Sequence, residues 1–178
     1  DAVQVGKDLQ VKEQILWGLA HLASTYAFML RFDDAEQVAA EGLAMAREMD
    51  NREFYSDIKT TESILEWRKG NLDAAIKAGE EAAQIGERIG LSIMVVFGLW
   101  GAGWSYGQRG EYNAAVDVLQ TALRAAEPFA EFMPFLITMA KAPLGSVMID
   151  AGMDRAAALE YHKHALALSE NPVGGMSN

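Results

Sequence analysis

Apolar and small residues recur with helical spacing in four segments of the chain that resemble one another. The segments are RFDDAEQVAAEGLAMAREM (31–49), GNLDAAIKAGEEAAQIGERI (70–89), RGEYNAAVDVLQTALRAAE (109–127) and AGMDRAAALEYHKHALAL (151–168). Ala35, Ala75, Ala115 and Ala157 fall at equivalent points, so the period is 40, 40 and 42 residues (75−35, 115−75 and 157−115). A repeat of this length is typical of stacked helix pairs.

The periodicity predicts eight helices in four antiparallel pairs and no strand. The first helices of the pairs are expected at 12–31, 52–69, 91–109 and 134–151. The second helices are expected at 33–49, 72–89, 112–126 and 154–169. The repeat domain therefore covers 12–169, in units 12–51, 52–90, 91–133 and 134–169, with a lead-in at 1–11 and a tail at 170–178.

The expected turns contain residues that end one helix and start the next. Gly70, Gly110 and Gly152 follow first helices, where glycine readily adopts a positive φ. A side-chain oxygen is available to cap the following helix at three positions, which are Asn71, Asn113 and Asp154.

Pro143 falls inside the first helix of the fourth unit. Proline removes one backbone hydrogen bond and clashes with the preceding turn. The sequence therefore predicts either a kink near 139–143 or a helix that begins only after Pro143.

Charge and composition narrow the class of function. The net charge of −10 argues against a nucleic-acid binder, because neutralising phosphates needs a surplus of Lys and Arg. The absence of cysteine fits a reducing, cytoplasmic setting. Residues 89–108 carry no formal charge, but their five glycines favour a buried helix over a membrane span. The chain starts at Asp1 without a leader, and we expect it to be a piece of a longer protein.

The pattern resembles the tetratricopeptide repeat (TPR), whose consensus places apolar, small and aromatic residues at fixed offsets. The third unit matches it best, with Leu99, Ala102, Gly103, Tyr106, Gly110, Tyr112, Ala115, Leu119 and Ala122. The period of 40 resembles the long-helix repeats of large bacterial signalling and regulatory proteins. The resemblance implies an all-α, right-handed α-solenoid of four antiparallel helix pairs.

The resemblance also implies that one face of each first helix lines a concave groove for a partner. Carried over position by position, the groove residues are Trp17, Phe28, Trp67, Arg68, Phe97, Trp100, Trp104, Gln108 and Met139. All four tryptophans of the chain are in this set. The alternative is that these aromatic residues form the core, which is the commoner place for aromatics at helical spacing.

The residues offer little catalytic chemistry. His162 and His164 are two positions apart on a helix, so they point away from each other and do not form a paired zinc site. We find no phosphate-binding glycine loop and no nucleophile with a His and acid partner. We therefore expect no enzyme activity, no cofactor and no metal.

Three functions remain open. The first is a protein-interaction scaffold that binds a protein or peptide partner in the aromatic groove. The second is a sensor domain that binds a small ligand such as a sugar and controls an attached effector. The third is a structural or self-associating solenoid. For this last function, we expect an apolar strip around Ala158, Tyr161 and Leu168 and a loosely ordered tail at 171–178.

Overall fold

The computed structural model describes residues 2–170, with side chains from residue 10 onward, and in this range it contains only helices. The helices are α1 (Ala2–Phe28), α2 (Phe32–Glu48), α3 (Arg52–Lys69), α4 (Leu72–Ile89), α5 (Ser92–Gln108), α6 (Tyr112–Ala126), the short 3₁₀ helix η1 (Glu127–Phe129), α7 (Pro134–Asp150) and α8 (Arg155–Glu170). The all-α prediction is confirmed for the described residues. None of their helices is both long and apolar enough to cross a membrane.

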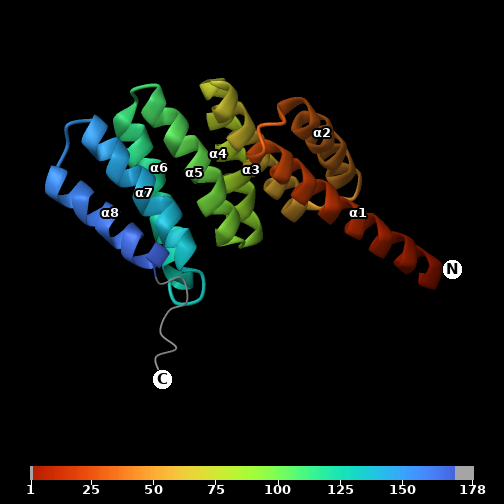
Figure 1. Cartoon of the computed structure of the whole chain (residues 1–178). Helices are drawn as coiled ribbons and strands as arrows, with labels where there is room; N and C mark the ends of the chain where they lie inside the picture. Colours follow the sequence, from red (N-terminus) through yellow and green to blue (C-terminus); the bar gives the residue numbers. More distant parts are fainter. Residues whose placement is uncertain (1, 171–178) are drawn as a thin grey trace.

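The helices stack as antiparallel pairs in chain order, from α1 at one end to α8 at the other (Figure 1). Each first helix also contacts the first helix of the next pair: α1 contacts α3, α3 contacts α5, and α5 contacts α7. Within residues 2–170, no such close approach of the backbones joins one second helix to another. The first helices therefore form the more closely packed of two layers.

The core between the layers is made mainly of small residues. Ala35, Ala75 and Ala115 are fully buried, as their shared place in the repeat predicts. In the fourth unit the buried equivalent is Ala158, not Ala157. In all four units the backbone N–H of this residue donates to the carbonyl oxygen four positions earlier. The expected register was wrong by one residue because the turn before α8 contains one extra residue.

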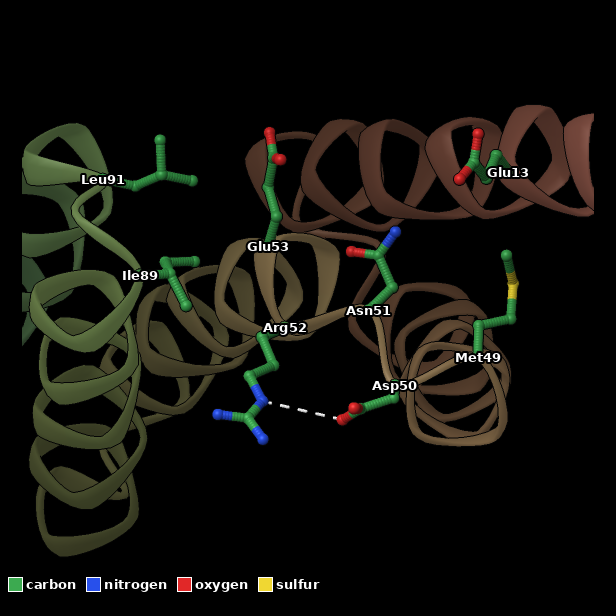
Figure 2. A pocket seen from close by; sticks show the side chains of 8 residues that line it. All are labelled: Glu13, Met49, Asp50, Asn51, Arg52, Glu53, Ile89 and Leu91. Carbon is green, nitrogen blue, oxygen red and sulfur yellow. Dashed lines mark ion pairs between the residues drawn. The ribbon is translucent and has the colours of Figure 1, made fainter.

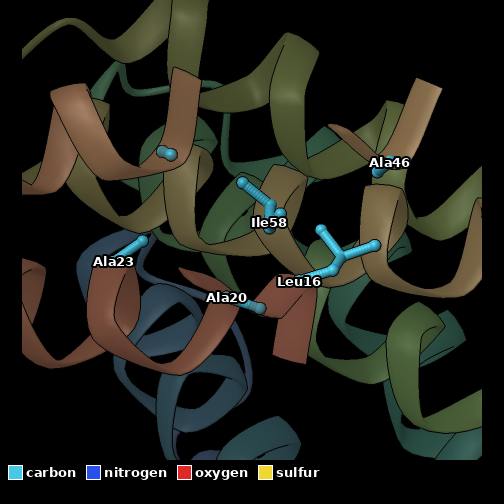
Figure 3. Close-up of a cluster of buried hydrophobic side chains, with 6 residues drawn as sticks. Leu16, Ala20, Ala23, Ala46 and Ile58 are labelled. Atoms are coloured by element: carbon cyan, nitrogen blue, oxygen red, sulfur yellow. The ribbon is translucent and has the colours of Figure 1, made fainter. Parts of the chain in front are cut away.

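At the first end of the stack, a buried cluster joins three helices. Leu16, Ala20 and Ala23 of α1 meet Ala39 and Ala46 of α2, and Ile58 of α3 fills the space between them (Figure 3). Ile58 and Leu16 are fully buried. Burying a side chain of this size stabilises the fold by about 1.5–3 kcal/mol.

At the centre of the stack, glycines let α4 and α5 approach closely. A Cβ atom on Gly98 would collide with the carbonyl oxygen of Gly79 and would lie 2.9 Å from the backbone nitrogen of Ala83. Gly98 is therefore a packing residue at this contact, and the other glycines of α5 pack elsewhere: Gly101 on Ser63 of α3, Gly103 on Leu119 of α6 and Gly107 on Val147 of α7.

In three of the four units, the predicted glycine lies in the turn between the two helices of the pair. Gly70, Gly110 and Gly152 all have a positive φ, between 66° and 84°. In the first unit Leu30 has a φ of 60° without being a glycine, a conformation that is uncommon for L-residues.

The predicted helix caps are only partly confirmed. Asp154 accepts hydrogen bonds from the backbone N–H groups of Ala156 and Ala157. Asn71 is at the start of α4 but makes no capping bond, since its side chain donates to Glu66 instead. Asn113 is not a cap, because it lies inside α6.

Two helix limits differ from expectation. Helix α7 runs from Pro134 through the buried Pro143, so the prediction of a start after Pro143 was wrong. Helix α1 begins at Ala2, ten residues before the expected start at 12. Residues 171–178, for which we expected a loose tail, lie outside the described range.

The apolar strip expected on the last pair lies on different residues. Ala158 is fully buried, and Tyr161 and Leu168 are half-buried against α6 and α7, because this face of α8 closes the pair. The exposed large apolar residues of α8 are Leu159 and Leu166.

Candidate aromatic binding site

Three tryptophans from two neighbouring first helices meet in one cluster. The ring of Trp67 on α3 stands edge-on to Trp100 of α5, with 5.7 Å between centroids and 72° between ring planes. It stacks on Trp104 of α5 at 6.0 Å and 21°. Trp100 and Trp104 are one turn apart, so both rings project from the same side of α5. The sequence predicted all three for one site, and the structure brings them together.

The burial of this cluster is intermediate. Trp67, Trp100 and Trp104 are all half-buried, so their rings are neither enclosed in the core nor free in solvent. The Nε1 atom of Trp67 is buried and has no hydrogen-bond acceptor. A buried N–H without an acceptor costs about 1–3 kcal/mol. The Nε1–H group of Trp67 could therefore donate a hydrogen bond to a ligand if a movement of the indole ring exposed it.

Arg68 extends the cluster toward solvent. Its guanidinium carbon lies 5.2 Å from the centroid of the Trp67 ring, within cation–π range. The residue is exposed, and in the described part of the chain no carboxylate lies within ion-pair distance of it. Gln108 is also exposed, at the end of α5. Arg68 is therefore free to bind an anionic group beside the indoles.

A second aromatic contact continues the surface onto α7. The rings of Phe97 and Phe135 lie 6.4 Å apart with 38° between their planes. Phe135 is 49% exposed, and Met139, one turn further along α7, is half-buried. The sequence reasoning missed Phe135, although it lies four residues before the predicted Met139. We call Trp67, Arg68, Phe97, Trp100, Trp104, Phe135 and Met139 the aromatic surface.

Three predicted groove residues are not part of this surface: Gln108, which is exposed at the end of α5, and Trp17 and Phe28. Trp17 and Phe28 lie on α1, where they are 58% and 57% exposed. Trp17 packs edge-on against His21, with 4.2 Å between ring centroids. No aromatic contact within the described residues links Trp17 or Phe28 to the cluster on α3 and α5.

Asp57 of α3 occupies the repeat position equivalent to Trp17 and Phe97. Burial raises the pKa of its carboxyl group, nearby Glu53 raises it further, and His21 opposes the rise. In residues 2–170 no Lys or Arg pairs with Asp57. This side of α3 therefore carries a carboxylate that the fold does not neutralise.

Two pockets lie away from the aromatic surface. One, of about 560 Å³, is open and lies where the turns before α3 and α5 face α1 (Figure 2). Glu13 and Glu53 line it beside apolar Ile89 and Leu91, and Arg52 pairs with Asp50 at 3.6 Å. Its mixed lining offers no convergent set of hydrogen-bonding groups.

The other pocket, of about 260 Å³, lies between α6, α7 and α8. Burial lowers the pKa of Lys141 there, against the opposing charge of Glu127. The Nζ atom of Lys141 contacts Nδ1 of His164, and Tyr161 lies beside it. No group of three His, Cys, Asp or Glu in the described chain is placed to hold a metal ion.

Comparison with known proteins does not assign the chain to a family. No family model matches the chain, and no curated protein matches it. The likeness to TPR proteins therefore remains a prediction from the sequence.

Proposed function

We propose that the protein is a right-handed, TPR-like α-solenoid that binds a segment of a partner protein on the aromatic surface. The close approach of successive first helices, without one between second helices, supports a curved stack with first helices on the inner side. An inner layer of this kind places α3, α5 and α7 side by side, which are the helices that carry the aromatic surface. The proposed setting is a cytoplasmic regulatory protein, in keeping with the absence of cysteine.

The observation that carries this proposal is the contact of three half-buried indole rings across α3 and α5. Rings that already pack on one another lose little conformational entropy when a ligand binds. Tryptophan and arginine are the residues that most often dominate binding energy at interfaces. Arg68, beside Trp67, supplies the second of these types.

The surface suits a segment that combines an apolar or aromatic side chain with a carboxylate. The apolar side chain would lie on Trp100 and Trp104, where indoles provide a large contact area. The carboxylate would pair with Arg68, whose planar guanidinium binds carboxylates through two parallel hydrogen bonds. The chain as a whole carries a net charge of −10, so a cation without an ion-pair partner, such as Arg68, is a distinctive feature of this surface.

The test is selection of peptides from a random phage-displayed library on the immobilised protein, followed by calorimetric titration of the selected peptide. Trp100→Ala should weaken its binding about thirtyfold or more, and Arg68→Ala by less, with a loss that shrinks at high salt. Phe132→Ala is the matched control, since Phe132 is 71% exposed and lies outside the surface. Equal affinity for wild type and Trp100→Ala, with both folded, would overturn the proposal.

A second candidate is a sensor domain for a small molecule such as a sugar. The near-parallel stacking of Trp67 on Trp104 favours a sensor domain, because the stacked rings concentrate aromatic surface area in one place. Tryptophan fluorescence during titration with a panel of mono- and disaccharides separates the two functions. Saturable quenching that Trp104→Ala abolishes, without any selected peptide, would favour the sensor.

A further inference from the structure

A stripe of apolar side chains lies exposed along α1, the first helix of the stack. Val11, Ile15, Leu22 and Met29 are 54%, 46%, 40% and 60% exposed. Their spacings of 4, 7 and 7 residues (15−11, 22−15 and 29−22) place them on one helical face. Gly18 is on the same face, and a Cβ added to it would meet no atom within 4 Å. We call this face the α1 stripe.

In the later pairs, the middle of the equivalent face is buried against the second helix of the preceding pair, whereas Lys69 and Arg109, equivalent to Met29, are exposed. Ile15 is equivalent to Val95 and Ile137, which are only 4% and 5% exposed. Gly18 is equivalent to Ile58, which is fully buried. The buried clusters that contain these residues join each first helix to the second helix before it. Ile58 of α3 shares a cluster with Ala46 of α2, and Val95 of α5 shares one with Ala83 of α4. Ile137 of α7 shares a cluster with Ala126 of α6. The α1 stripe therefore has the composition of a pair-to-pair interface, and within the described residues no helix covers it.

The other end of the stack presents the opposite half of the same interface. Leu159 and Leu166 of α8 are 50% and 59% exposed and lie seven residues apart on one face (166−159). Leu166 is equivalent to Leu43, Ala83 and Leu123, each of which packs against the first helix of the next pair. We call Leu159 and Leu166 the α8 stripe.

We propose that the α1 stripe of one copy of this chain packs on the α8 stripe of a second copy, head to tail. This contact would continue the interface inside the molecule, which is built from these same repeat positions between α2 and α3, α4 and α5, and α6 and α7. The contact uses a different face on each copy, so it is heterologous and adds further copies in one direction. It involves neither Trp100 nor Arg68, so it is independent of the proposed peptide binding.

Sedimentation equilibrium over roughly a hundredfold range of concentration tests this contact. The weight-average mass of the wild-type chain should rise above the monomer mass of 19.4 kDa as the concentration increases. Ile15→Glu and Leu166→Glu each place a charge in one stripe, and each should weaken association by more than about thirtyfold. Ala40→Glu adds the same charge to an exposed position of α2, outside both stripes, and should associate like the wild type.

Mixing the two stripe variants decides the geometry. Ile15→Glu keeps an intact α8 stripe and Leu166→Glu keeps an intact α1 stripe, so an equimolar mixture should form a dimer that cannot grow. Circular dichroism and thermal melting confirm that each variant is folded before it is mixed. A monomeric wild type at every concentration would overturn the proposal and indicate a further repeat as the occupant. Association of Leu166→Glu alone would also overturn it, because it would show contact between two α1 stripes.

Discussion

Helices α1 and α5 hold equivalent places in their pairs but experience different surroundings. Trp17 and Gly18 of α1 correspond to Phe97 and Gly98 of α5, each 80 positions later (97−17 and 98−18). Trp17 is 58% exposed and Gly18 faces open space, whereas Phe97 is half-buried and Gly98 is fully packed. Helix α5 has first helices on both sides, α3 and α7, and α1 has only α3. A residue's position in the repeat therefore determines which face of its helix the side chain lies on, and the neighbouring helix pairs determine how deeply that side chain is buried.

The two glycines give the largest expected difference between these helices. Gly98→Ala should destabilise the protein by about 3 kcal/mol, because the new Cβ would collide with the backbone of Gly79, which does not move away cheaply. Gly18→Ala should stabilise it by up to about 1 kcal/mol, because alanine is the better helix former and nothing obstructs its Cβ. Urea unfolding of both variants measures the difference.

A third variant controls for helix propensity in this pair. Ala44→Gly introduces the reverse change at an exposed position in the interior of α2, so it measures helix propensity without a loss of packing. Equal effects of Gly98→Ala and Gly18→Ala would show that the close approach of α4 and α5 is not a determinant of stability.

The tryptophans provide the next largest contrast. Trp100→Ala should cost about 2 kcal/mol of stability, roughly half the loss for a fully buried aromatic ring, because Trp100 is half-buried against Trp67. Trp17→Ala should change stability by less than about 0.5 kcal/mol, as for most exposed residues. Acrylamide quenching of the remaining indoles and urea unfolding check both values. A loss of 4 kcal/mol or more for Trp100→Ala, with unquenched indoles, would place the ring in the core and contradict the binding site.

The turns allow a smaller test of the same kind, between an end pair and a central one. Asp154→Ala should cost about 1 kcal/mol, because its carboxylate accepts two backbone hydrogen bonds at the start of α8. Asn71→Ala at the equivalent turn should cost less, because Asn71 makes no capping bond to α4. Thermal melting compares the two variants. A greater loss for Asn71→Ala would mean that its bond to Glu66 matters more than helix capping.

The sequence predicted the helices well where the turns carry glycine. The limits of α3, α4 and α6 agree with the expected ranges to the residue, and Gly70 and Gly90 cap the C-termini of α3 and α4 with a positive φ. The register of the last unit could not be predicted, because Ala157 and Ala158 are both alanine and only the turn length distinguishes them. The start of α1 was missed because residues 2–11 lack the small-residue repeat of the other helices.

The candidate site was predictable only in part, because burial depends on the neighbouring helices. Repeat position placed Trp67, Trp100 and Trp104 on one face, and packing of α3 on α5 then brought them into contact. Repeat position also placed Trp17 in the groove, but among the described residues only α2 and α3 contact α1, and Trp17 is exposed. Phe135 was missed because it lies inside the predicted helix but one turn before Met139, the first groove position carried over to this unit.

The smallest expected effect concerns Asp57 of α3, the helix between α1 and α5. Burial raises the pKa of Asp57 above its value of about 3.9 in an unfolded chain. The protonated form therefore favours folding. This contribution is complete below the unfolded pKa and is lost as the pH rises through the folded pKa. At neutral pH the ionised carboxylate opposes folding, so Asp57→Asn should stabilise the protein by less than about 1 kcal/mol.

Urea unfolding at a series of pH values between neutrality and pH 4 measures this effect. The advantage of Asp57→Asn over the wild type should shrink as the pH falls, because the wild-type carboxyl group then takes up its proton. Asp117→Asn, at an exposed position of α6, is the control and should stay within about 0.5 kcal/mol of the wild type throughout. If Asp57→Asn instead lowers stability at neutral pH, the attraction between His21 and Asp57 outweighs burial, and α1 stabilises α3 through charge as well as packing.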